Sequence, residues 1–249
     1  MQKHILDGED VRLRDATAAY AVLSLAGPKA REVLSLVSDV NLSDSAFCLN
    51  SLKKLYIGHA PVFAQRLSYT GELGWEIFVT PDFAEYVFET LLEAGEPFGL
   101  RLVGAEALNA LRIEKGFLHW GHDMSYTEAP HQVGLSSICR PHKPVSFIGR
   151  DAYLERTAKG KGPFLCFVKL KSPKPLLHHN EPVLIDEKIV GYVSSGAFSY
   201  AQDAAVGICF INLDDKTLIE SGSHAVVVEG QVIPADLSLK PFSLLKKSN

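Results

Sequence analysis

Hydrophobic and polar positions alternate most regularly between residues 61 and 80 of the chain. Residues 61–68 form an apolar run that includes a glutamine and an arginine, which predicts a partly buried strand. In residues 75–80 apolar side chains recur with a period of two on the face of Trp75, and Glu76 lies on the opposite face. The glycines at 71 and 74 separate the two runs and can adopt positive φ without a Cβ clash. The pattern therefore predicts two strands joined by a turn.

The carboxylate of Glu76 is the first candidate binding group in this hairpin. We expect the turn to bring it back beside the hydroxyl of Tyr69. A carboxylate fixed on a strand can accept two parallel N–H bonds from an amidine- or guanidine-like edge, such as the edge of a pterin. The alternative is a hairpin whose two glutamates, Glu72 and Glu76, are only solvated, which is the usual state of exposed glutamates.

The remainder of the N-terminal half predicts two further strands and two helices. The strands are expected at residues 20–25 and 52–57. One helix is expected from Pro28 to about Val37, and Thr80-Pro81-Asp82 supplies a cap, a proline and an acid for a second helix that Gly95 closes. This order predicts an α+β layer, with helices on one side of a mainly antiparallel sheet.

The C-terminal half changes character after one more helix. Residues 105–115 predict that helix, with Ala107, Leu108 and Leu111 expected to pack closely and Gly116 as its stop, and a long polar and aromatic loop follows. Residues 157–162, rich in Gly and Lys, predict a linker. After it, short strands separated by Gly, Pro, Asn and Asp indicate an all-β sandwich or barrel, with strands at 164–170, 189–194, 205–211, 224–228 and 232–239. We therefore expect two domains, residues 1–156 and 163–249.

Composition and charge exclude several classes of protein. The chain is 47% hydrophobic and 22% charged with a formal net charge of -4, which is ordinary for a globular protein and gives no broad basic field for nucleic acid. No apolar run reaches the length of a membrane span, and no glycine-rich dinucleotide or nucleotide motif occurs. The four cysteines form no C-x-x-C pair, which predicts buried thiols in a reducing compartment, the cytoplasm or, in a eukaryote, the mitochondrial matrix.

Three motifs in the same order resemble the folate-binding T-protein (aminomethyltransferase) family. They are YTGELGWE at residues 69–76, LRIEKGFLHWGHDM at 111–124 and FIGRDAYLER at 147–156. The family includes the folate-binding modules at the C-terminal end of dimethylglycine and sarcosine dehydrogenases, and the second motif is most similar to that branch. The resemblance implies ferredoxin-like α+β halves followed by a C-terminal β-barrel, and it implies tetrahydrofolate as the cofactor.

The same resemblance assigns the candidate binding residues. It implies that Tyr69 and Glu76 bind the folate, that Phe117 lines the pterin pocket, and that Trp120 stacks on the ring or lines its channel. Arg112 is a further candidate. The alternatives are core or lid packing for Phe117 and Trp120, and a helix arginine paired with nearby acids for Arg112. A metal site at the nearby H-x-x-H-D sequence is not expected, because the spacing matches no standard helical pair.

Two departures from the family pattern leave open whether the chain is catalytically active. Leu108 stands where glycine-cleavage members have an arginine that helps to hold the folate. The segment that carries the family's catalytic carboxylate is expected to lie before Met1, so no catalytic residue is assigned. The basic residues Lys246 and Lys247 could meet the folate glutamate tail or form a frayed polar end.

Two functional hypotheses follow from these patterns. The first is a tetrahydrofolate-binding module of one-carbon transfer, whose partners are a small amine donor and a flavin domain or another subunit. It would form the C-terminal part of a dimethylglycine or sarcosine dehydrogenase-like protein. The second is a non-catalytic member of the same fold that acts as a regulatory or interaction subunit.

Overall fold

We describe the protein from a computed structural model, which covers residues 2–160, 162–213 and 217–244. The chain forms two compact units, Met1–Val103 and Gly104–Asn249, and each is described by itself. The division between these units, after Val103, comes earlier in the chain than the linker predicted at residues 157–162. The domain boundary predicted at that linker stays a prediction. Throughout the described ranges, every helix is too short or too polar to span a bilayer.

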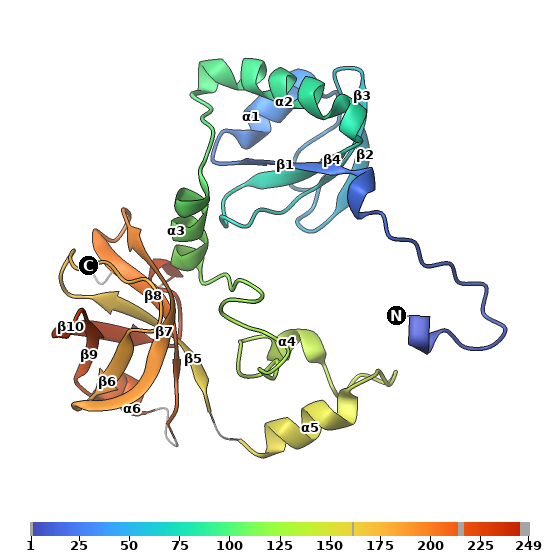
Figure 1. The fold of residues 1–249 in the computed structure, drawn as a ribbon. Helices are drawn as coiled ribbons and strands as arrows, with labels where there is room; N and C mark the ends of the chain where they lie inside the picture. Colours follow the sequence, from blue (N-terminus) through green and yellow to red (C-terminus); the bar gives the residue numbers. More distant parts are fainter. Residues whose placement is uncertain (1, 161, 214–216, 245–249) are drawn as a thin grey trace. The chain divides into compact units, whose positions relative to one another are not determined.

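The first unit is a four-stranded antiparallel sheet with helices on one face (Figure 1). The strands lie in the order β1 (Ala21–Ala26), β4 (Gly74–Val79), β3 (Ala60–Gln65) and β2 (Leu52–Ile57). The helices are α1 (Ala30–Val37) and α2 (Pro81–Gly95), and single 3-10 turns occur at η1 (Gln2–His4), η2 (Thr17–Ala19) and η3 (Glu96–Phe98). The two helices leave the other face of the sheet open within this unit.

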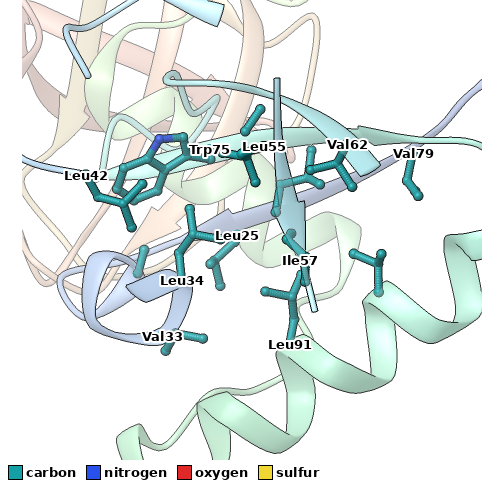
Figure 2. Packing of buried hydrophobic residues seen from close by; sticks show 14 of the residues in the cluster. Leu25, Val33, Leu34, Leu42, Leu55, Ile57, Val62, Trp75, Val79 and Leu91 are labelled. Carbon is teal, nitrogen blue, oxygen red and sulfur yellow. The ribbon is translucent and has the colours of Figure 1, made fainter. Parts of the chain in front are cut away.

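Side chains from the two helices and from one face of the sheet form the core of the first unit. Leu34 of α1 points toward Leu25 of β1, and Leu91 of α2 points toward Ile57 of β2 (Figure 2). Trp75 of β4 is fully buried in the same cluster. Burying a side chain of this size contributes on the order of 2–3 kcal/mol, which fixes the register of β4. That register places Glu76 on the opposite, open face.

The second unit contains a closed six-stranded antiparallel barrel, so the α+β layer followed by an all-β barrel is confirmed. Its strands lie in the order β10 (Gln231–Ser238), β5 (Phe164–Leu170), β8 (Ala204–Ile211), β7 (Lys188–Ser199), β6 (Pro182–Ile185) and β9 (His224–Val228), and β9 pairs with β10 to close it. The buried cluster inside the barrel is aliphatic apart from two thiols, Cys166 and Cys209, which lie opposite each other on β5 and β8. These two cysteines are buried as expected, whereas Cys48 is exposed and Cys139 is half-buried.

Helices outside the barrel complete the second unit. α3 (Ala105–Lys115) packs against β7 and β8, and its Ile113 contacts Phe167 and Ile208 on the outer surface of the barrel. The other helices are short: α4 (Ser136–Cys139), α5 (Arg150–Ala158), α6 (Leu218–Ser221) and η4 (Phe242–Leu244). α3 is therefore the helix that connects the loop after it to the barrel wall.

Local details differ from three expectations in the first unit. Pro28 lies in a turn and α1 begins two residues later, at Ala30. Thr80 precedes α2, but its side chain makes no capping hydrogen bond. Gly71 has the expected positive φ of 68°, whereas Gly74 does not. Instead, a Cβ on Gly74 would lie 2.7 Å from the carbonyl oxygen of Leu25, so glycine is needed there for the close approach of two strands.

The second unit corrects two further expectations. The buried residues of α3 are Arg112 and Ile113, whereas Ala107, expected to pack closely, is exposed. The strand expected at 189–194 extends over the twelve residues of β7. β6 was not predicted, because its four residues begin with a proline and are too few to show a period.

Candidate functional site

The open face of the first sheet carries the predicted carboxylate in a row of polar side chains. Glu76 on β4 lies opposite Ser24 on β1 and Gln65 on β3. Directly opposite residues of an antiparallel pair share a face, with Cβ atoms about 5 Å apart. Glu76 is half-buried, and among the described residues none of the three side chains has a hydrogen-bond or ion-pair partner. The row therefore presents a carboxylate, an amide and a hydroxyl with unused bonding capacity.

An apolar row lies beside the polar one on the same face. Phe78 pairs with Val22 on β1 and with Phe63 on β3, two residues along each strand from the polar row. The ring of Tyr20 packs edge-on against Phe63, with 6.2 Å between ring centroids. Val22 is 51% exposed. A flat ring lying on this surface would have an apolar floor and the Glu76 carboxylate about 7 Å further along the strand, at its edge.

The turn before β4 positions Tyr69 through local hydrogen bonds. The hydroxyls of Ser68 and Thr70 are 2.7 Å apart, and the backbone N–H of Thr70 donates to Ser68 Oγ at 3.2 Å. Gly71 follows in the left-handed region. Tyr69 is half-buried between these residues. The turn is therefore fixed by its own side chains. Tyr69, in this turn, and Glu76, on the second strand of the predicted hairpin, both lie in the first unit.

The other three predicted residues lie in the second unit, at α3 and the loop after it. Arg112 is 1% exposed. Its guanidinium donates to Asn109 Oδ1 at 2.9 Å, to the carbonyl oxygen of Phe117 at 3.1 Å, to Ser195 Oγ at 2.7 Å and to the carboxylate of Asp123. These bonds engage four of its five N–H groups. The structure thus favours the alternative for Arg112, a helix arginine paired with an acid, and its contact with folate stays a prediction.

Phe117 and Trp120 are more exposed than the charged residues Arg112 and Asp123. Phe117 is 39% exposed and Trp120 is 64% exposed. The N–H of Gly121 donates to the carbonyl oxygen of Met124 at 2.7 Å, which closes the loop immediately after Trp120. Their exposure suits contact with a ligand or partner better than the alternative of core packing, and their contact with folate also stays a prediction.

Asp123 is the functional candidate that sequence reasoning missed. In the sequence it stands out only as part of the H-x-x-H-D motif, and no group of three or more metal-binding side chains occurs within the part of the chain that the structure describes. The Asp123 side chain is fully buried. Burial acts to raise the pKa of Asp123, but hydrogen bonds from Ser194, Ser195 and the backbone of His119, with the charge of Arg112, outweigh it and hold the pKa below its usual value.

One cavity in the first unit lies apart from the predicted site. It encloses about 250 Å³ between the turn after β1 and residues 98–103. Its walls are mostly apolar, with Lys29 and Arg101 as its charged side chains, and its lining includes none of the predicted binding residues. Lys246 and Lys247, the alternative contacts for a folate tail, lie outside the described residues.

Two family models match the chain. The "GCVT N-terminal domain" matches residues 1–143 and the "Glycine cleavage T-protein C-terminal barrel domain" matches residues 164–243. The crystal structure of the glycine cleavage system aminomethyltransferase T from Bartonella henselae has the same fold, with a TM-score of 0.73 at 24% identity over 91% of this chain and 60% of that one.

Curated relatives include enzymes much longer than this chain. Dimethylglycine dehydrogenase of Rattus norvegicus is 34% identical over 238 residues, which are 95% of this chain and 27% of that protein. The aminomethyltransferase of Halothermothrix orenii is 34% identical over 223 residues, 90% of this chain and 61% of that protein. The chain thus spans less than a third of the dehydrogenase and less than two thirds of the transferase. With the matched models and the fold, these likenesses show that the chain belongs to the glycine cleavage T-protein (aminomethyltransferase) family.

Proposed function

We propose that the chain is a tetrahydrofolate-binding module of one-carbon transfer. The observation that carries the proposal is the half-buried Glu76 carboxylate, which has no partner among the described residues and lies beside an apolar surface. A pterin offers two parallel N–H groups to such a carboxylate and a flat ring to such a surface. The names of the relatives, an aminomethyltransferase and a dimethylglycine dehydrogenase, support folate and a methylated amine as the reactants.

In this proposal the protein contributes binding, orientation and shielding from water. Bound tetrahydrofolate supplies the nitrogen nucleophile that takes up the one-carbon unit from a small amine donor. Glu76 and Tyr69 fix the ring on the first unit, and Phe117 and Trp120 are predicted folate contacts of the second unit. Positioning of this kind can supply several kcal/mol of the lowering of a reaction barrier. No residue of this chain is assigned as an acid or base, and a flavin domain or another subunit would supply the oxidised amine.

Calorimetric titration with tetrahydrofolate under reducing conditions tests the proposal. Glu76→Gln keeps the size of the side chain but removes the charge, and bonds to a charged acceptor are worth about 1.5–3 kcal/mol. We expect its Kd to rise by roughly 10- to 150-fold. Glu72→Gln is the matched control, since Glu72 is an exposed carboxylate of the turn before β4, and its Kd should stay within about twofold. Equal affinities for Glu76→Gln and the unaltered chain would contradict the proposal.

A second candidate function is that of a non-catalytic regulatory or interaction subunit. Leu108 on α3 favours it, because the family resemblance places a folate-holding arginine at this position. In this case the unaltered chain would show no heat of binding with millimolar tetrahydrofolate. Binding of tetrahydrofolate that depends on Glu76 would remove this second candidate.

A further inference from the structure

A bulge in β7 places two neighbouring serines against one carboxylate. The pairing of β7 with β8 shifts register between Val193 and Ser195. Neighbouring side chains of a regular strand point to opposite faces, and a bulge redirects one of them. Here Ser194 Oγ and Ser195 Oγ both donate to Asp123 Oδ1, each at 2.6 Å. The bulge therefore provides two buried hydrogen-bond donors for the carboxylate of Asp123.

The second carboxylate oxygen of Asp123 joins the loop to α3. Asp123 Oδ2 accepts from the guanidinium of Arg112 and, at 2.8 Å, from the backbone N–H of His119. Arg112 also donates to Ser195 Oγ at 2.7 Å. One carboxylate thus connects α3, the loop and β7, and all of these groups lie within the second unit.

A pair of histidines makes a second attachment of the same loop. The ring of His122 stacks on that of His179, with 4.7 Å between centroids. His179 Nδ1 lies 2.6 Å from the carbonyl oxygen of Ser194, so Nδ1 carries the proton and donates. Trp120 lies between the attachments at His119 and His122, yet its ring is mostly exposed. A fixed backbone with an exposed aromatic ring is suited to a surface that contacts a ligand.

Stability alone does not explain a charged network at this position. A buried ion pair replaced by apolar residues of similar volume is often no less stable, because removing two charges from water is costly. What the network adds is one defined conformation, since its hydrogen bonds can be satisfied together only when the loop lies on the bulge. A loop with one fixed conformation also holds its two exposed aromatic residues, Phe117 and Trp120, in fixed positions.

We propose that Asp123 is a positioning residue, which fastens the loop of residues 117–124 to the β7 bulge and so holds Phe117 and Trp120 in place for a folate ring. The proposal rests on the proposed function for its ligand. It assigns no direct contact between Asp123 and folate.

The two tryptophans of the chain, Trp75 and Trp120, allow a direct test, since each lies in a different unit. In protein labelled with 5-fluorotryptophan, the fluorine NMR spectrum has one signal from each, assigned with Trp120→Phe. We expect Asp123→Asn to shift or broaden the Trp120 signal and to leave the Trp75 signal unchanged. The Kd for tetrahydrofolate should rise at least tenfold in the same variant.

Ser195→Ala is a milder variant in case Asp123→Asn fails to fold, and it should change the Trp120 signal in the same direction. Ser199→Ala is the matched control, because Ser199 is a buried serine of the same strand whose Oγ accepts from the N–H of Gln202 instead. It should change neither the signals nor the affinity.

An unchanged Trp120 signal, an equal change in both signals, or a moved Trp120 signal with unchanged affinity would each overturn the proposal. If the unaltered chain binds no tetrahydrofolate, the proposed function fails, and the folate part of this inference fails with it. The Trp120 signal then still decides whether Asp123 holds the loop.

Discussion

Removing the buried carboxylate of Asp123 should destabilise the second unit strongly. In Asp123→Leu the guanidinium of Arg112 stays buried without its counter-charge, and the hydroxyl of Ser195 loses its acceptor. Breaking a buried pair by removing one partner costs about 3–5 kcal/mol. That is a large part of the roughly 5–15 kcal/mol by which a domain is stable. For a unit of this size it corresponds to a fall in Tm of roughly 6–20 °C.

Removing both charges should cost much less than removing one. In the double variant Arg112→Met with Asp123→Leu, no unpaired charge is left in the interior. We expect a free energy of unfolding within about 1–2 kcal/mol of the unaltered chain. The difference between the double variant and the sum of the single variants measures the coupling of the pair.

Urea unfolding followed by tryptophan fluorescence measures these energies unit by unit. Trp75→Phe leaves Trp120 as the reporter of the second unit, and Trp120→Phe leaves Trp75 as the reporter of the first. The Trp75 transition should not move in either single variant. A cost below about 1 kcal/mol for Asp123→Leu, or a double variant as unstable as the worse single variant, would refute the reasoning.

Two further predictions follow from ionisable groups of the second unit. The pKa of Asp123 is lower in the folded chain than in the unfolded chain. Its contribution to stability is therefore complete above the unfolded pKa of about 4 and is lost as the pH falls further. Measurements of Tm at decreasing pH should show this loss in the unaltered chain and not in Asp123→Asn. Burial, and to a smaller extent the neighbouring Cys166, raises the pKa of the Cys209 thiol well above its usual value. Iodoacetamide at pH 8 should therefore alkylate the exposed Cys48 in minutes and Cys209 only after unfolding, and mass spectrometry would detect both products.

The elements that sequence predicted well are those with a local cause. The period of two around Trp75 follows from one buried face, and the structure has that face buried. The helix expected at 105–115 has those bounds, because Gly116 adopts the left-handed conformation that ends it. Ala107 shows the limit of such reasoning, since helical periodicity does not say which face meets the barrel.

The parts that sequence did not predict depend on contacts between distant residues. Asp123 meets Ser194 and Ser195 across about 70 positions of the chain, and no local pattern indicates that pairing. The bulge in β7 is equally invisible, because an extra residue in a strand changes neither its composition nor its length noticeably. The candidate site divides in the same way: the hairpin of Glu76 could be predicted from its pattern, whereas the surroundings of Arg112 could not.

The two units differ in whether their sheets have free edges. The barrel closes on itself and offers no unpaired strand to another chain, whereas the four-stranded sheet ends in β1 on one side and β2 on the other. β2 carries Lys53 and Lys54, and lysines on an edge strand oppose unwanted pairing. β1, with the sequence AVLSLA, carries no charge. β1 is therefore the edge of this sheet that is better suited to strand addition by another chain.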